Sequence, residues 1–288
     1  MEIQEKWTEI YTKEQLKRLQ QLELIELKVV KKVCDQLNIK FVLYGGTLLG
    51  AVKYQGFIPW DDDVDIAMDR DSYEKFIAEA PSLLPEDFVL TNLYSDPKSP
   101  YSYTKMRIRG TRCIEKGNHK LEIEQGVYMD IYPIDDIPDN EELYQKQFQK
   151  LQHIFDVIYT RQCLHHADKG RLYFLKEIKR IFYHLFYRAI PISYLRKLQK
   201  KEMTKYNGTG CSRKSCWHYP KLTNYYEQYY PLQVVKYENG EYYAPGDARE
   251  HLIRRYGDID SIPPAEKRLG HEVFILDFGA FKEKDPQW

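Results

Sequence analysis

The 288-residue chain has no net charge, no long apolar run and no obvious pairing among its cysteines. Lys plus Arg and Asp plus Glu number 43 each, so no overall positive field favours nucleic acid. No segment reaches the ~18 apolar residues of a transmembrane helix. The N-terminal segment is polar and lacks the apolar core of a signal peptide. With 43% hydrophobic and 30% charged residues, the sequence predicts an ordinary soluble protein.

The five cysteines are odd in number and mostly far apart, which argues against a disulfide framework and favours a reducing cytoplasm. Cys211 and Cys216 are close enough in sequence to ligate zinc together, with Cys163, His165 or His166 completing a site. Their spacing departs from that of a standard zinc knuckle. The alternative is a surface loop that carries two free thiols.

Hydrophobic periodicity and turn residues predict a chain in which helices and strands alternate. Thr12 and Gln15 form a capping-box pattern at the start of a long amphipathic helix that ends near Asn38. Further helices are expected over 47–53, 71–80, 140–160 and 247–257, and strands over 40–44, 63–68, 101–109, 111–116 and 127–133. Residues 57–60 and 207–216 are expected to be loops.

Four aspartates, Asp61, Asp62, Asp63 and Asp65, lie within five residues. Alternate residues of a strand face the same side, so Asp63 and Asp65 should point together while the residues between and after them face the core. Clustered carboxylates repel one another, and two on one strand face are suitable ligands for Mg²⁺. Asp61 and Asp62 are equally open to another interpretation, a solvated turn or a helix cap.

Asp130 is the best candidate for a third metal ligand. It is a lone acid in the apolar, β-prone segment 128–132. Burying an acid is costly unless it has a partner, so such a position usually has a partner or a function. Asp135 and Asp136 follow Pro133 and are interpreted as turn residues.

Gly45, Gly46 and Thr47 follow a predicted strand and precede a predicted helix. Glycine lets backbone N–H groups approach a phosphate closely, and a helix N-terminus attracts anions. A glycine turn alone is a weak signal. Followed by paired acids on the next strand, it becomes the arrangement of nucleotidyltransferases.

Phosphoryl transfer also needs cationic side chains, and two sets are available. Lys105 and Arg107 share one face of a predicted strand, although that face could simply be solvated. Lys267, Arg268 and His271 form a second set near the C-terminus.

Segment 171–205 is rich in Lys and Arg, with aromatic and aliphatic side chains interleaved. It is predicted to form helices interrupted near Pro191. A basic, aromatic, amphipathic helix suits a membrane surface that carries anionic lipid. A core-packing helix with a solvated basic face is an equal alternative.

The segment 46–68, GTLLGAVKYQGFIPWDDDVDIAM, resembles the signature of the LicD family, the phosphocholine transferases of bacterial surface polysaccharides. Fukutin and fukutin-related protein share that domain. The resemblance extends to 34–39, 105–111, 126–135 and 242–271, and so covers nearly the whole chain, most weakly over 140–230. Family members carry Arg-His where this chain has Lys53 and Tyr54.

The resemblance implies an α+β (α/β) fold, with a nucleotidyltransferase-like mixed sheet flanked by helices and additional C-terminal helices. A single LicD-type transferase domain is expected over 1–288. Within it we expect a core over about 38–138, a helical and lid region over about 139–241 and a closing block over 242–288.

Carried over from the family, Asp63, Asp65 and Asp130 would be catalytic ligands of Mg²⁺ or Mn²⁺. Asp130 is expected nearest the attacking hydroxyl, as a metal ligand and general base. The glycine turn would hold the phosphates of the donor, assisted by the two cationic sets. The implied donor is CDP-choline, and the implied acceptor is a sugar hydroxyl of a lipid-linked oligosaccharide or teichoic acid precursor, with CMP expelled.

A choline donor would need aromatic faces for its trimethylammonium group. Trp60, Tyr128 and Tyr132 are candidates because they lie close to the acids in sequence. Each is also open to interpretation as an ordinary core aromatic. A lipid-linked acceptor would place the protein in the cytoplasm, peripherally at the inner face of the cell membrane.

Other functions stay open at this point. Ethanolamine, glycerol or ribitol phosphate could be transferred by the same chemistry. A true nucleotidyltransferase would instead attach the nucleotide and release pyrophosphate. A non-catalytic binding protein is a further alternative, and the intact set of Asp63, Asp65 and Asp130 argues against it.

Overall fold

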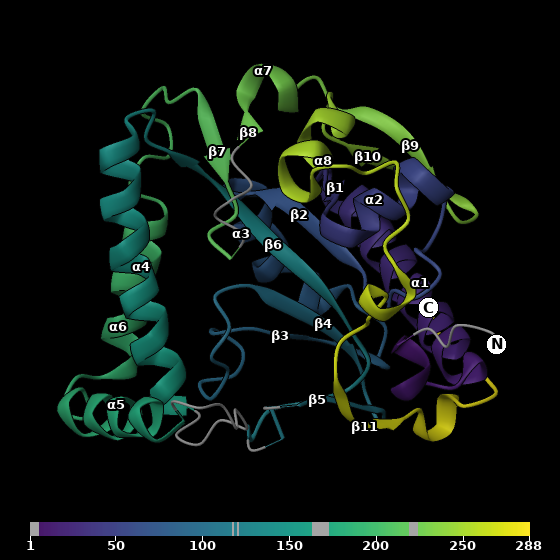
Figure 1. Ribbon diagram of the computed structural model, residues 1–288, viewed down its shortest axis with the longest axis horizontal. Helices are drawn as coiled ribbons and strands as arrows, with labels where there is room; N and C mark the ends of the chain where they lie inside the picture. Colours follow the sequence, from purple (N-terminus) through teal and green to yellow (C-terminus); the bar gives the residue numbers. More distant parts are fainter. Residues whose placement is uncertain (1–5, 117, 120, 163–172, 219–223) are drawn as a thin grey trace.

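The computed structural model describes residues 6–116, 118–119, 121–162, 173–218 and 224–288. Within them, one mixed sheet of nine strands is flanked by helices, as the sequence predicts (Figure 1). The strand order is β3-β4-β6-β2-β1-β10-β9, and β7 and β8 extend the sheet beside β6. These strands are β1 (Val42–Leu43), β2 (Asp65–Asp69), β3 (Phe88–Thr91), β4 (Thr104–Ile108), β6 (Tyr128–Ile137), β7 (Arg213–Ser215), β8 (Asn224–Tyr225), β9 (Gln233–Tyr237) and β10 (Gly240–Ala244).

Helix α1 (Lys13–Leu37) packs against β4 and β6. The capping box is present, with the Thr12 hydroxyl accepting from the Gln15 N–H and the Gln15 side chain accepting from the Thr12 N–H. The helix ends as predicted at Asn38, whose φ of 53° is left-handed. Leu19 and Leu22 on its apolar stripe are fully buried, and each such side chain contributes roughly 1.5–3 kcal/mol.

Helix α2 and strand β2, which lie near the glycine turn, do not begin at the residues predicted from the sequence. Helix α2 (Gly45–Tyr54) starts at the glycines themselves, which form its first turn rather than a loop before it. Strand β2 starts at Asp65 and not at Asp63. The carbonyl of Val64 nevertheless accepts from the Asp130 N–H at 2.8 Å, so the chain is already aligned with β6 one residue earlier.

Strand β6 pairs in parallel with β2 and antiparallel with β4 and β7. It runs on through Asp135 and Asp136, so their interpretation as turn residues was wrong. The physical reason is remote in sequence: Ser215 and Lys214 of β7 pair with these two acids and extend the strand beyond Pro133.

The strands on either side of Gly110 belong to different sheets. Strand β4 lies in the central sheet, whereas β5 (Arg112–Glu115) pairs with β11 (Val273–Asp277) in a separate two-stranded sheet. The C-terminal block thus reaches back to the middle of the chain. Strands β3, β7, β8, β9, β10 and β11 were not predicted. Most residues of β9 are exposed, so this strand lacks a buried apolar face that would mark it in the sequence.

Helices α4 (Glu141–Gln162), α5 (Tyr173–Phe186) and α6 (Ile192–Met203) form an arm at the left of Figure 1. The break at Pro191 between α5 and α6 matches the prediction. The remaining helices are α3 (Arg70–Glu79), α7 (Tyr226–Tyr229) and α8 (Ala248–Tyr256). Asp247 caps α8 by accepting from the Glu250 N–H. No helix in the described part of the chain is long and apolar enough to cross a membrane.

Residues 207–216 are only partly a loop, because β7 lies within them. Cys216 is buried in an aromatic cluster with Tyr132 and Tyr229. The residues expected to complete a zinc site with Cys211, namely Cys163, His165 and His166, lie outside the described residues.

Arg70 at the start of α3 makes two hydrogen bonds to Asp135 of β6, one of them 2.7 Å long, and the Asp135 carboxylate is fully buried. We expect Arg70→Ala to lower the free energy of unfolding by about 3–5 kcal/mol, because it leaves a buried charge without its partner. The measurement is urea unfolding. Arg249→Ala is the control, because its pair with Asp260 is exposed to solvent and should contribute little to stability. Equal losses in the two variants would contradict the assignment.

Candidate metal and phosphate site

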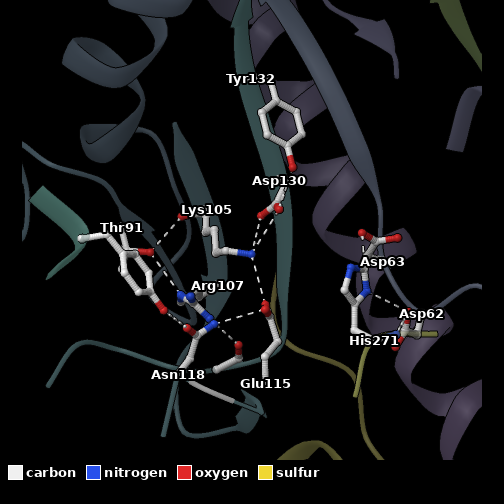
Figure 2. A network of polar contacts seen from close by, with 12 residues as sticks. Asp62, Asp63, Thr91, Lys105, Arg107, Glu115, Asn118, Asp130, Tyr132 and His271 are labelled. Carbon is white, nitrogen blue, oxygen red and sulfur yellow. Dashed lines mark hydrogen bonds and ion pairs between the residues drawn. The ribbon is translucent and has the colours of Figure 1, made fainter. Parts of the chain in front are cut away.

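A row of charged side chains crosses three neighbouring strands of the central sheet. Asp65 of β2 pairs with Asp130 of β6, and Asp130 pairs with Lys105 of β4. Paired residues of neighbouring strands point to the same face, so the two acids and the lysine lie together. Lys105 Nζ is 2.8 Å from Asp130 Oδ1 (Figure 2).

Asp65 is fixed by the strand–helix turn next to it. Its backbone N–H donates to the Thr47 hydroxyl at 2.8 Å, and its carbonyl accepts from the Tyr44 N–H at 2.9 Å. A Cβ at Gly45 would lie 2.3 Å from Asp65 Oδ2, and the φ of Gly45 is +56°, so glycine is required there. The side chain is 4% exposed, and its Oδ1 is buried without a hydrogen-bond partner among the described residues.

Three acids of the cluster, Asp61, Asp63 and Asp65, have raised pKa values. Burial is the largest cause and neighbouring carboxylates add to it, so that the pKa of Asp63 is raised to about 6. The pKa values of Asp61 and Asp65 are raised for the same reasons. A divalent cation would offset this repulsion and would also satisfy the buried Asp65 oxygen. The donor set therefore fits a hard cation such as Mg²⁺.

Asp62 has a structural role. Its carboxylate accepts a hydrogen bond from the Tyr11 hydroxyl at 2.5 Å. It also accepts from the backbone N–H and ring Nδ1 of His271 at 2.8 and 3.0 Å (Figure 2). It ties both ends of the chain to the loop before β2. Asp62 is buried, so the alternative of a solvated turn was wrong for this residue. The hydrogen bond to Asp62 raises the pKa of His271 to about 11, which makes its imidazole charged at neutral pH.

Among the described residues, Asp62, Asp63 and His271 form the group whose metal-ligating atoms lie within 4.8 Å of one another. Hydrogen bonds already occupy both oxygens of Asp62, and a charged imidazole has no lone pair to offer. Asp63 is therefore the member of this group that is best able to bind an ion. Asp63, Asp65 and Asp130 as a set do not meet the same distance in the described structure, so their joint role as ligands stays a prediction.

Lys105 lies between Asp130 and a second acid, Glu115 of β5. The distance from Lys105 Nζ to Glu115 Oε1 is 3.5 Å. Burial opposes the charged form of Lys105, but Asp130 and Glu115 outweigh burial and raise its pKa. Burial likewise opposes the charge of Glu115, yet Lys105 and a hydrogen bond from Tyr128 lower its pKa to about 2. The predicted cation is thus held beside the predicted acid, and Glu115 is a member of the site that sequence reasoning missed.

The other predicted cations make contacts elsewhere. Arg107 donates to the Thr91 hydroxyl at 3.1 Å and to the Gly126 carbonyl at 2.9 Å. These hydrogen bonds join β4 to β3 and to the loop before β6. Lys267 is exposed. Arg268 donates to the Pro263 carbonyl at 2.9 Å.

The three candidate choline-binding aromatics already have close neighbours. The Arg268 guanidinium lies 5.1 Å from the ring centre of Trp60, and Lys105 Nζ lies 3.5 Å from that of Tyr128. The Tyr132 hydroxyl donates to Asp130 Oδ2 at 2.9 Å, and its side chain is buried. Their proposed contact with choline stays a prediction.

Two buried acids on α1, Glu23 and Glu26, were also missed. Burial raises the pKa of both, and the carboxylate of Asp63 adds to the effect on Glu23. Three of their four carboxylate oxygens are buried without a hydrogen-bond partner in the described structure. The sequence could have indicated their burial, because both acids lie next to the apolar stripe of a strongly periodic helix.

A mixed sheet, a helix that starts at a glycine pair and paired acids on neighbouring strands define a nucleotidyltransferase-like domain. Residues 38–157 match the family described as LicD/FKTN/FKRP, nucleotidyltransferase domain. This match confirms, over residues 38–157, the resemblance seen in the motifs.

Similarity to one characterised relative extends well beyond that domain. The lipopolysaccharide cholinephosphotransferase LicD of Haemophilus influenzae is 23% identical over 251 residues, which cover 85% of this chain and 92% of the relative. Uncharacterised proteins of Rickettsia prowazekii and Rickettsia typhi are each 48% identical, but over only 42 residues, or 15% of this chain and 16% and 14% of theirs.

The different roles of Asp62 and Asp63 predict opposite effects on stability in the presence of a chelator. Asp62→Asn should lower the free energy of unfolding by about 1–3 kcal/mol, because charged His271 loses its counter-ion. Asp63→Asn should raise the free energy of unfolding by at most about 3 kcal/mol, because it removes a buried charge. The folded pKa of Asp63, about 6, lies above that of an unfolded aspartate, so its charge penalises folding fully above pH 6 and not at all below about pH 4.

The gain from Asp63→Asn should therefore be larger at pH 7.5 than at pH 5. Thermal unfolding in EDTA at the two pH values checks this. A loss of stability in Asp63→Asn comparable to that in Asp62→Asn would contradict the distinction between the two acids.

Proposed function

We propose that the chain is a Mg²⁺-dependent transferase that moves phosphocholine from CDP-choline to a sugar hydroxyl of a teichoic acid or other cell-surface polysaccharide precursor, releasing CMP. The observation that carries this proposal is the Asp65–Asp130–Lys105 row beside helix α2, which starts at the glycine pair. One buried oxygen of Asp65 has no hydrogen-bond partner in the described part of the chain. Similarity along 92% of a relative named as a cholinephosphotransferase supports the choice of phosphocholine.

In this proposal Asp63, Asp65 and Asp130 hold the divalent ion. When bound, the ion would neutralise the diphosphate and stabilise the leaving CMP. The first turn of α2, at Gly45, Gly46 and Thr47, offers backbone N–H groups to the donor phosphates.

Asp130 is the proposed general base. It would take the proton of the sugar hydroxyl while that oxygen bonds to the phosphorus nearer the choline and the bond to the CMP oxygen breaks. Hydrogen bonds from Lys105 and from the Tyr132 hydroxyl hold its carboxylate in place.

We expect Asp65→Asn to reduce CMP release from CDP-choline by about 100-fold or more, because it removes a proposed metal ligand. EDTA should abolish the activity of the wild-type protein, and Mg²⁺ should restore it. Mg²⁺ should also raise the melting temperature of the wild type and not that of Asp65→Asn. The control is Asp71→Asn, an exposed acid on α3 that should behave as wild type.

The assay uses CDP-choline, CDP-ethanolamine, CDP-glycerol and CDP-ribitol separately, each with a cell-envelope acceptor extract. CMP release with one of the other three alone would reassign the alcohol. Release of pyrophosphate from a nucleoside triphosphate, with the nucleotide attached to an acceptor, would identify a true nucleotidyltransferase. Full activity of Asp65→Asn would refute the metal assignment.

We place the proposed membrane contact on α5. Seven large apolar side chains of this helix are between 45% and 73% exposed: Phe174, Leu175, Ile178, Ile181, Phe182, Leu185 and Phe186. At about 100° per residue they fall within an arc of about 140°. Such a stripe on a peripheral helix is typical of a membrane-surface contact.

The positive charge of this region is smaller than its composition suggests. Arg196 is buried and donates to carbonyls at 93, 97 and 99, and Lys200 pairs with Glu74. Exposed Arg188, Lys197 and Lys201 remain to attract anionic lipid. Apolar insertion should therefore contribute more to binding than charge does.

We expect the wild-type protein to float with vesicles containing anionic lipid at low salt. Replacing Phe182 and Phe186 by Glu should abolish flotation, because each charge would have to enter the apolar layer. Phe274→Glu is the control, since this residue is 60% exposed on β11. Absence of flotation in the wild type, or a stable dimer that the double variant dissociates, would overturn the assignment.

A further inference from the structure

A pocket of about 500 Å³ lies between α4, α5 and residues 217–218. Gln152, Phe155, Asp156 and Tyr159 line it from one face of α4, at the spacing of successive helical turns. Lys179, Arg180 and Tyr183 of α5 form the opposite wall. Its size, its aromatic rings and its few polar groups are those of a small-molecule site.

The back wall of the pocket adjoins the row of charged residues. His218 lines the pocket, and its ring centre is 4.4 Å from that of Tyr103 and 6.0 Å from that of Tyr132. The Tyr132 hydroxyl in turn donates to Asp130. The pocket therefore lies two aromatic rings, those of His218 and Tyr132, from the proposed general base, which places it beside the proposed reaction site.

The charges that line the pocket are unsuited to choline. Lys179 and Arg180 are each paired with a carboxylate, Lys179 with Asp156 at 3.3 Å and Arg180 with Glu177 at 2.6 Å. Burial and nearby Lys105 lower the pKa of His218 to about 3, so this ring is neutral, and its Nε2 lies 2.7 Å from the Ser102 hydroxyl. A quaternary ammonium group would meet carboxylates that are already paired with cations, whereas the hydroxyl groups of a neutral molecule can hydrogen-bond to both members of such pairs.

Aromatic faces are available to such a molecule. The Phe155 and His218 rings are parallel, 5.7 Å apart and inclined by 3°, and Tyr159 and Tyr183 stand on the facing helices. A pyranose ring has apolar C–H faces that pack on aromatic rings and hydroxyl groups that bond to amide, carboxylate and guanidinium groups.

We infer that the pocket between α4 and α5 binds the saccharide part of the acceptor, and that choline binds elsewhere. The inference rests on the proposed function, because it assigns the acceptor to the same reaction. It also relates the two faces of α5, since the helix lines the pocket with Tyr183 while its apolar stripe faces outward, where a lipid attached to the saccharide could enter a membrane.

The experiment is saturation-transfer difference NMR on the full chain with methyl hexosides and methyl N-acetylhexosaminides, and separately with choline and phosphocholine. We expect signals from at least one glycoside and none from choline. Tyr183→Ala should weaken the glycoside signal by about fivefold or more. The matched control is Phe182→Ala, which changes the neighbouring residue on the exposed face of the same helix and should leave the signal intact.

Tyr183 also packs against the apolar cluster around Leu195, so its removal could unfold α5. Gln152→Ala on α4 is therefore a second test, with the same expected loss. Choline or phosphocholine signals that either variant abolishes would overturn the inference. The absence of any glycoside signal from the wild type at a glycoside concentration of about 20 mM would overturn it as well, because even weak binding gives a signal there. Asp65→Asn should keep its glycoside signal while losing CMP release, so failure of the proposed function and failure of this inference can be told apart.

Discussion

The burial of many carboxylates in one small region is the constraint on which the rest of this structure depends. Asp62, Asp65 and Asp130 are each almost fully buried, where unpaired charge is costly. The fold meets this cost with partners from distant segments, because Lys105 reaches Asp130 from β4 and His271 reaches Asp62 from the C-terminal block. Among the described residues, one oxygen of Asp65 has no hydrogen-bond partner. This buried oxygen is one reason why we propose that the site binds a cation.

This constraint also explains the arrangement of the chain around the sheet. The Asp62 carboxylate holds Tyr11 and His271, which are 260 residues apart, against the loop before β2. Lys53 donates to three successive carbonyls over 259–261 and secures the same C-terminal block to α2. Segments from both ends therefore enclose the acids, and stability and site assembly depend on the same contacts.

Much of the fold could be predicted where the local signal is strong. The capping box and apolar stripe specify α1, and Asp247 and Gly257 delimit α8 as expected. Asp135 and Asp136 were misassigned because the strand that pairs with them, β7, lies some 80 residues further on. The edge strand β9 escaped prediction because edge strands need not alternate apolar and polar residues.

The site was predictable in part for a similar reason. The acid spacing at 63 and 65 and the lone acid at 130 are local departures from an apolar pattern, so the sequence reveals them. Glu115 beside Lys105, and the His271–Asp62 pair, depend on contacts between segments that local patterns do not report.

The sequence by itself determined the types of residue that the site contains and the elements on which they stand. It also carried the family motif, because that motif is contiguous in the chain. Only the tertiary structure decided which acids receive a cationic partner, that Asp62 is structural, and that an aromatic pocket lies behind the His218 and Tyr132 rings next to Asp130. These outcomes depend on strand register and on burial. Both are properties of how distant segments pack, and a one-residue change of register would turn each side chain to the opposite face of the sheet.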